Sequence, residues 1–235
     1  MFYSIPFSGR AHNYTSEEVE EVTKVMQSAI PLTQGSYLEK FQSKFCEYSS
    51  ANNAFAVNNA TAALELTAQI CQFHQGDEVV IPSHTYTSSA YPFLKKGANI
   101  VWADIDLKTR VVTAQTLEKC ITGKTKAIVV VHLYGYCANM PEIIHLANKH
   151  NIIVIEDAAQ ALGARIGQHM AGTFGDFGIV SFHSHKNIST IGEGGMLIVK
   201  SNKVAKIIPK LHHNGHCDFS FEREQYWIPA MGNVD

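Results

Sequence analysis

The sequence lacks the features of several large functional classes. Lysine and arginine number 19 against 21 acidic residues, a net charge of −2, and they form no dense basic stripe that could neutralise a run of phosphates. The apolar runs at 127–131 and 152–155 are far shorter than a membrane span, and residues 1–10 have no basic segment followed by an apolar one. We therefore expect no nucleic-acid partner, no membrane segment and no export signal.

Cysteine is scarce, and its spacing is not that of a zinc ribbon or a redox motif. The cysteines are odd in number and scattered, at Cys46, Cys71, Cys120, Cys137 and Cys217. Metal-ligand types gather in two places, one formed by His183 and His185 and the other by His212, His213, His216 and Cys217. The second group lacks a closed tetrahedral spacing and is more typical of a polar loop. These patterns favour a reducing cytoplasm and no metal site.

Amphipathic stretches alternate with short β-branched runs along the whole chain, which is the pattern of an α/β fold. Strands are predicted at Asn53–Val57, Glu78–Ile81, Asn99–Ala103, Ala127–His132, Ile152–Ile155, Phe177–Phe182 and Gly195–Val199, and helices at Ser16–Ser28, from Thr61 onward, at Ala114–Cys120 and at Met140–His150. Such elements predict a doubly wound, mostly parallel sheet with helices on both faces. Residues 1–30 would form an N-terminal arm and a helix capped by Ser16, and residues 31–235 the large domain.

Ligands of such sheets bind at the carboxyl ends of the strands, and three of these ends carry polar residues. The first is the turn at Asn58–Ala60, which leads into the predicted helix. Free N–H groups at a helix N-terminus bind anions, so Thr61 and Ala62 are candidates to face a phosphate. The alternative is that Asn58, Asn59 and Thr61 only cap and shape the turn.

The second strand end is the apolar run Ile152–Ile155, which is followed by Glu156 and Asp157. A carboxylate of Asp157 at the rim of the sheet can pair with the protonated ring nitrogen of a pyridine cofactor, so that the ring remains an electron sink. Gln160 could hydrogen-bond the phenolic oxygen of the same cofactor. Alternatively, Asp157 caps the following loop. Glu156 is expected in solvent or in a salt bridge.

The third strand end, Phe177–Phe182, delivers Ser181 and then Lys186 to the same rim, ahead of the glycine-rich segment Gly192–Gly195. Glycines there let the backbone fold closely round a bound group. A partly desolvated lysine has a neutral amine that can form a Schiff base with a cofactor aldehyde, and Ser181 could donate its hydroxyl to a phosphate. A single lysine is usually a surface charge, so the case for Lys186 depends on its neighbours.

Several short motifs follow one another in an order that is more specific than any one of them. They are Ile5–Ser8, Leu32–Gly35, Thr61–Leu64, Gly76–Val79, Pro82–Tyr86, Val131–Gly135, Glu156–Gln160, Ser181–His183, and Lys186–Asn187 with Gly192–Gly195. On these motifs the chain resembles, over nearly its whole length, the sugar aminotransferases of the DegT/DnrJ/EryC1/StrS group. This group is a branch of the fold-type I pyridoxal phosphate enzymes.

The resemblance implies pyridoxal 5'-phosphate (PLP) as the cofactor, with its phosphate held by Thr61, Ala62 and Ser181. It implies Lys186 as the Schiff-base lysine, Asp157 as the partner of the ring nitrogen and Gln160 as a neighbour of the phenolic oxygen. Tyr86 would stack on the ring, with ordinary core packing as the alternative. The implied partners are an amino donor, commonly glutamate, a nucleotide-linked keto-deoxy sugar, and a second copy of the chain in a homodimer with shared active sites.

The sequence departs from the family pattern in two places. Ala60 stands where glycine is common, which is a mild change if its φ is negative. Family members usually continue beyond Asp235 into a smaller C-terminal domain, and Gly232–Asn233 only partly matches the stretch that reaches the partner subunit's phosphate. Asn233 is therefore a candidate cofactor contact, and we expect a PLP-binding large domain that is truncated before the small domain.

Three alternatives remain open on sequence grounds. In a nicotinamide-dependent oxidoreductase a glycine run would open a helix, whereas Gly192–Gly195 precedes the strand-like run Met196–Val199. Sister sugar dehydratases have histidine where Lys186 stands, so the lysine favours amino transfer. A non-catalytic paralogue or fragment with a role in assembly or regulation would agree with the short C-terminus.

Overall fold

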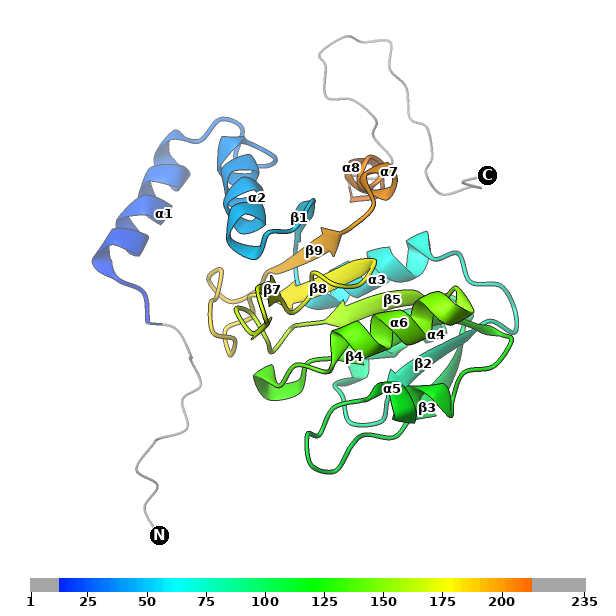
Figure 1. Cartoon of the computed structure of the whole chain (residues 1–235). Helices are drawn as coiled ribbons and strands as arrows, with labels where there is room; N and C mark the ends of the chain where they lie inside the picture. Colours follow the sequence, from blue (N-terminus) through cyan, green and yellow to red (C-terminus); the bar gives the residue numbers. More distant parts are fainter. Residues whose placement is uncertain (1–12, 213–235) are drawn as a thin grey trace, which may run out of the picture.

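The computed structural model describes residues 13–212, and its centre is a seven-stranded sheet in the order β1-β9-β8-β5-β4-β2-β3 (Figure 1). The strands are β1 (Ala54–Val57), β2 (Glu78–Pro82), β3 (Asn99–Ala103), β4 (Thr125–Val131), β5 (Ile153–Asp157), β8 (Phe177–Ser181) and β9 (Gly195–Val199). Strand β9 is antiparallel to both of its neighbours, and all other pairings are parallel. A separate antiparallel pair joins β6 (Arg165–Ile166) to β7 (His169–Met170). The predicted α/β class with a mostly parallel sheet is confirmed.

Helices cover both faces of this sheet. They are α1 (Ser16–Ser28), α2 (Ser36–Ser49), α3 (Ala60–Ile70), α4 (Tyr91–Lys95), α5 (Ala114–Glu118), α6 (Met140–His150), α7 (Asn202–Ala205) and α8 (Ile208–His212), with 3-10 turns η1 (Thr87–Ser89) and η2 (Leu133–Gly135). The chain moves from β1 through β2 to β3 and then returns through β4 to β5. Right-handed crossovers therefore place α3 and α4 on one face and α5 and α6 on the other, as Figure 1 shows. The predicted doubly wound arrangement is confirmed.

The strands nearest the middle of the sheet are apolar on both sides. Every residue of β8 and β9 is buried, as are the last four residues of β5 and the last five of β4. Strands that helices cover on both faces show no alternation of polar and apolar residues, which is why the apolar runs in the sequence were continuous. This rigid layer fixes the positions of the residues that follow each strand. No helix within residues 13–212 is long and apolar enough to cross a membrane.

Several predicted bounds differ from the structure by one or two residues: the strands predicted at Asn53–Val57, Glu78–Ile81, Ile152–Ile155 and Phe177–Phe182 and the helix predicted at Ala114–Cys120 are Ala54–Val57, Glu78–Pro82, Ile153–Asp157, Phe177–Ser181 and Ala114–Glu118. Three further differences concern His132, the cap of α1 and a helix that was not predicted. The strand predicted at Ala127–His132 is Thr125–Val131, so His132 lies past its end. The cap of α1 is Thr15, because its hydroxyl accepts the N–H of Glu18, whose carboxylate in turn accepts the N–H of Thr15. The predicted cap, Ser16, is thus the first residue of the helix itself. Helix α2 was not predicted; its Phe41 and Phe45 pack on Phe182, with ring centroids 5.5 and 6.2 Å apart.

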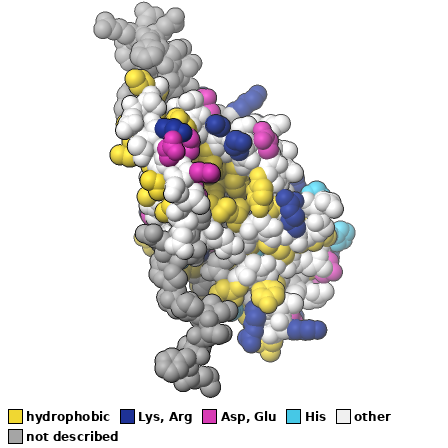
Figure 2. Space-filling view, turned by 90° about the vertical axis from the view of Figure 1, so that its left-hand side faces the viewer, with side chains coloured by type: hydrophobic (Ala, Val, Ile, Leu, Met, Phe, Trp, Pro, Cys, Tyr) yellow, Lys and Arg dark blue, Asp and Glu magenta, His cyan; other side chains and the backbone are white. Residues whose placement is uncertain are grey.

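Helix α1 keeps its predicted bounds but buries none of its residues within the described part of the chain. Its apolar side chains are exposed, including Val19 at 56% and Met26 at 73%, and the segment that follows it exposes Ile30 at 96%. Figure 2 shows hydrophobic side chains at the surface on this side of the molecule. An amphipathic helix gains its stability mainly from a partner on its apolar face. The exposed apolar face of α1 therefore indicates that another surface packs against it.

Candidate active site

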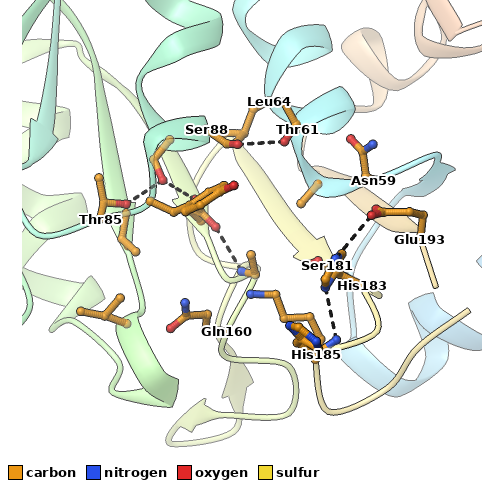
Figure 3. A pocket seen from close by; sticks show the side chains of 18 residues that line it. Asn59, Thr61, Leu64, Thr85, Ser88, Gln160, Ser181, His183, His185 and Glu193 are labelled. Carbon is orange, nitrogen blue, oxygen red and sulfur yellow. Dashed lines mark hydrogen bonds and ion pairs between the residues drawn. The ribbon is translucent and has the colours of Figure 1, made fainter. Parts of the chain in front are cut away.

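A cavity of about 460 Å³ lies at the carboxyl ends of β4, β5 and β8 (Figure 3). Its walls come from segments that are far apart in the sequence: the start of α3, the turn around η1, and the residues that follow β4, β5 and β8. The predicted site residues that line it are Thr61, Tyr86, Asp157, Gln160, Ser181 and Lys186. Ala62 is not among the lining residues, and Asn233 lies outside the described residues. Six of the eight predicted site residues therefore lie in the wall of one cavity.

Asp157 ends β5, is 7% exposed and lines the cavity. Its Oδ2 accepts the hydroxyl of Ser89 at 2.7 Å, and its Oδ1 accepts the N–H of Ala159 at 3.1 Å. The second bond is the loop cap that was the alternative for this residue, so Asp157 both caps its loop and faces the cavity. An ionised carboxylate has about four acceptor positions. Asp157 can therefore still accept a hydrogen bond from a cationic N–H in the cavity.

Gln160 lines the cavity with an amide whose orientation is fixed. Its Oε1 accepts the N–H of Tyr134 at 2.9 Å, and Tyr134 has φ 54°, a left-handed conformation that is uncommon outside glycine. Because the carbonyl oxygen is committed to this bond, the side-chain NH2 group is the part of Gln160 that can serve the cavity. It could donate to an anionic oxygen, and its contact with a phenolic oxygen stays a prediction.

Tyr86 lies in the cavity wall but is 73% exposed, so ordinary core packing, the alternative considered for it, does not describe this side chain. It precedes η1, and its carbonyl oxygen accepts the N–H of Ser89 at 3.0 Å. An aromatic ring on a hydrogen-bonded turn can stack on a planar group in the cavity.

At the start of α3, Thr61 donates its hydroxyl to Ser88 at 2.9 Å, as Figure 3 shows. The N–H of Ala62 donates to Asn59 Oδ1 at 2.9 Å, so Asn59 caps the helix, as the alternative for this turn had it. An anion would compete with Asn59 for that N–H, and the phosphate contact of Ala62 stays a prediction. Ala60 is the first residue of α3 and has no positive φ, so its replacement of glycine is mild.

Ser181 ends β8, is 6% exposed, and lies next to the turn that starts α3 because β9 runs between β8 and β1. Gly195 in β9 is opposite both Ser181 and Val57. A Cβ atom on Gly195 would come within 2.6 Å of the carbonyl carbon of Asn59 and 2.7 Å of the nitrogen of Ala60. The glycine predicted to allow close folding thus brings two hydroxyls, those of Thr61 and Ser181, to one end of the cavity.

Lys186 is partly buried and lines the cavity on a turn in which its N–H donates to the carbonyl oxygen of His183 at 2.8 Å. His183 Nδ1 accepts the N–H of His185 at 3.2 Å, and its Nε2 lies 3.5 Å from Glu193 Oε1. Within residues 13–212, no group of three or more His, Cys, Asp and Glu side chains could hold a metal ion. His213, His216 and Cys217 of the second candidate group lie outside the described residues.

Glu156 was expected in solvent or in a salt bridge, and the first expectation is wrong. Its side chain is fully buried, and its two oxygens accept the N–H groups of Gly172, Phe174 and Gly175 at 2.7–2.9 Å. His132 Nε2 lies 2.9 Å from Glu156 Oε2, while its Nδ1 accepts the N–H of Ala138. Since Nδ1 is an acceptor, the proton of a neutral His132 is on Nε2 and points at Glu156. The partner of Glu156 is therefore a buried imidazole together with backbone amides.

Comparison with known proteins identifies the chain's relatives. The DegT/DnrJ/EryC1/StrS aminotransferase family matches residues 12–233. The chain belongs to this family. It is 37% identical to GDP-perosamine synthase from Escherichia coli O157:H7 over 218 residues, which cover 93% of this chain and 58% of that protein. The resemblance read from the motifs is thereby confirmed.

Solved structures of aminotransferases have the same fold. An aminotransferase from Psychrobacter cryohalolentis gives a TM-score of 0.82 at 33% identity, covering 90% of this chain and 53% of that one. A sugar aminotransferase from Streptococcus pneumoniae in its PLP form gives 0.79 at 30% identity, covering 88% and 58%. The chain thus spans little more than half the length of these relatives. This coverage agrees with a match to their large domain.

Proposed function

We propose that this chain holds PLP on Lys186 and forms the cofactor-binding domain of an aminotransferase that transfers an amino group from glutamate to a nucleotide-linked keto-deoxy sugar. The observation that carries the proposal is that Lys186, Asp157 and Ser181, from separate segments, line one cavity. Family membership supports PLP as the cofactor. The relative named GDP-perosamine synthase supports a sugar nucleotide as the acceptor.

The residues of the cavity fit PLP at both of its ends. Asp157 has acceptor capacity for a protonated ring nitrogen, and the hydroxyl of Ser181, which accepts the N–H of His183, can donate its own proton to a phosphate. The hydroxyl proton of Thr61 goes to Ser88, so Thr61 would donate to a phosphate only after turning away from Ser88. When bound, PLP supplies an aldehyde for a Schiff base and a ring that accepts electrons from the reacting carbon. The cavity volume of about 460 Å³ is within the range of small-molecule sites.

In this proposal some groups of the protein stabilise charge on the cofactor ring, and Lys186 transfers a proton. The carboxylate of Asp157 holds a proton on the ring nitrogen, and the Gln160 amide donates to the phenolic oxygen. The amine of Lys186, once released, carries a proton between two carbon atoms as a general base and then a general acid. Tyr86 limits the tilt of the ring by stacking on it.

We further infer a homodimer that shares its active sites. The exposed apolar face of α1 supports this proposal, because it offers a surface for a second copy of the chain. Asn233 would then reach the phosphate in the partner subunit. Sedimentation that finds a monomer with tight PLP binding would argue against this part of the proposal.

A non-catalytic paralogue with a role in assembly or regulation is the second candidate function. The two candidates differ in what glutamate does to the bound cofactor. With glutamate added, an aminotransferase converts the aldehyde form to the amine form and releases 2-oxoglutarate, and a keto-sugar nucleotide then restores the aldehyde form. Absorbance spectra report both steps.

The test compares this chain with a form extended to the length of its relatives, and Lys186→Ala in each form is the control. If both forms bind PLP on Lys186 but neither yields 2-oxoglutarate from glutamate or an oxo acid from any other amino acid, amino transfer is the wrong reaction. Protein that stays colourless after incubation with PLP would favour the paralogue.

A further inference from the structure

A chain of two hydroxyl groups ends on Asp157. Ser89 donates to Asp157 Oδ2 at 2.7 Å, and the oxygens of Ser89 and Thr85 are also 2.7 Å apart. Ser89 is fully buried, and both Ser89 and Thr85 belong to the cavity wall. Thr85 was named in the sequence only as part of the motif Pro82–Tyr86, and Ser89 was not predicted as a site residue, because 68 positions separate it from Asp157.

The direction of this chain follows from the charge on Asp157. An ionised carboxylate can only accept, so the single hydroxyl proton of Ser89 must point at Asp157. Ser89 then has no proton left for Thr85, and the hydroxyl of Thr85 must donate to Ser89. Hydrogen bonds aligned in one direction polarise and strengthen one another. The hydrogen bond from Ser89 thus holds the carboxylate of Asp157 in one orientation.

The turn that carries Ser89 also fixes the opposite end of the cavity. Ser88, the preceding residue, accepts the hydroxyl of Thr61, so adjacent serines contact the start of α3 and the end of β5. The N–H of Ser89 donates to the carbonyl oxygen of Tyr86, which holds the turn closed. A group seated between Thr61 and Asp157 would therefore meet a wall whose two ends are set by one short segment.

We propose that Ser89, supported by Thr85, is a positioning residue that keeps the carboxylate of Asp157 aimed at the protonated ring nitrogen of the cofactor. This inference rests on the proposed function, since it assumes that the cavity takes a PLP-like ring. It adds a role for two residues that contact Asp157 and each other. If Ser89 has this role, loss of its hydroxyl should weaken binding only of a ligand with a basic ring nitrogen. Loss of a serine that only stabilises the fold would weaken binding of all ligands alike.

The test measures the dissociation constants of two probes by equilibrium dialysis: PLP, and 1-deazapyridoxal phosphate, which has carbon in place of the ring nitrogen. Ser89→Ala should weaken PLP about tenfold, the effect of one hydrogen bond to a charged group. The same substitution should weaken the deaza probe less than about twofold, because that probe has no N–H for Asp157. Ser49→Ala is the matched control, since Ser49 is also fully buried and donates to a carbonyl oxygen, that of Phe45, away from the cavity.

An equal loss for both probes, or no loss for PLP, would overturn the role of Ser89. If Ser89→Ala does not fold, Thr85→Val decides instead, with an expected two- to threefold loss confined to PLP. No preference between the probes in that variant overturns the proposal as well. Failure of the unmodified chain to bind PLP would instead contradict the proposed function, so the two failures are distinguishable.

Discussion

Two neighbouring carboxylates at the end of β5 have opposite surroundings. Glu156 and Asp157 are consecutive, and alternation along a strand turns them to opposite faces of the sheet. Glu156 is fully buried, with three backbone N–H groups and the His132 imidazole as donors, and it is not in the cavity wall. Asp157 has two protein donors and faces the cavity. Glu156, whose acceptor positions are all used, connects segments of the protein, whereas Asp157 has acceptor positions left for a ligand.

The difference shows how burial alone misleads in the search for functional groups. Glu156 is more buried than Asp157, yet all of its acceptor positions are used within the protein. Its amide donors, Gly172, Phe174 and Gly175, precede β8, the strand that ends at Ser181. Glu156 therefore holds the segment before β8 in place, while Asp157 keeps acceptor positions that face the cavity. Two substitutions, one in each carboxylate, test this contrast, and the pH dependence of a third buried group, Cys71, extends it. They follow in order of the expected effect.

The largest effect is expected on stability, from Glu156→Gln. This change replaces one acceptor oxygen by an NH2 group that faces N–H donors, and breaking a buried charged network costs about 3–5 kcal/mol. The free energy of unfolding in urea should fall by this amount. Asp157→Asn is the matched variant one residue away and should lose about 1 kcal/mol or less. Equal losses in the two variants would remove the distinction between a structural and a functional carboxylate.

The second effect is expected on chemistry, from Asp157→Asn. An amide cannot hold the ring nitrogen protonated, so transfer of the amino group should slow by about 100- to 1000-fold, or about 2.7–4 kcal/mol. The rate of PLP conversion by glutamate measures this loss in stopped-flow absorbance. A folded Asp157→Asn protein that reacts at the normal rate would mean that Asp157 is only the cap of its loop.

The smallest effect concerns Cys71, a buried group without the donors that surround Glu156. Burial raises the pKa of its thiol to about 12, and only the charge of Lys126 opposes that rise. An unfolded thiol ionises near pH 8.5, so the folded state has its full stability below that pH and loses it as the pH rises toward 12. The loss due to Cys71 should be about 1 kcal/mol at pH 9.

Urea unfolding of the unmodified chain and of Cys71→Ala, repeated from pH 7 to pH 10, isolates this contribution. The difference in unfolding free energy between the two should shrink as the pH rises. A difference that stays constant would show that the folded protein accommodates the thiolate as readily as water does.

The sequence was sufficient for features that depend on local pattern. The bounds of α1, β3 and β9 were predicted as they stand, because periodic apolar residues and β-branched runs are local signals. Helix α2 was missed although Leu38, Phe41 and Phe45 recur at helical spacing, a signal that was present and not used. The site residues that ended strands were located because strand order brings carboxyl ends to one rim.

Contacts between distant segments could not be read from the sequence. Ser89 meets Asp157 across 68 positions, and the amides of 172–175 fold back under Glu156 only because β8 pairs with β5. The N–H of Ala62 is taken by Asn59, a choice between anion binding and capping that composition does not decide. Such contacts depend on how whole helices and strands pack, which local sequence patterns do not reveal.

The attachment of PLP to Lys186 is the central claim, and borohydride reduction tests it directly. The chain, incubated with PLP and reduced, is digested, and its peptides are mapped by mass spectrometry. We expect one phosphopyridoxyl adduct, on Lys186, and its loss in the Lys186→Ala variant. An adduct on another lysine, or no adduct in protein that demonstrably binds PLP, would contradict the account.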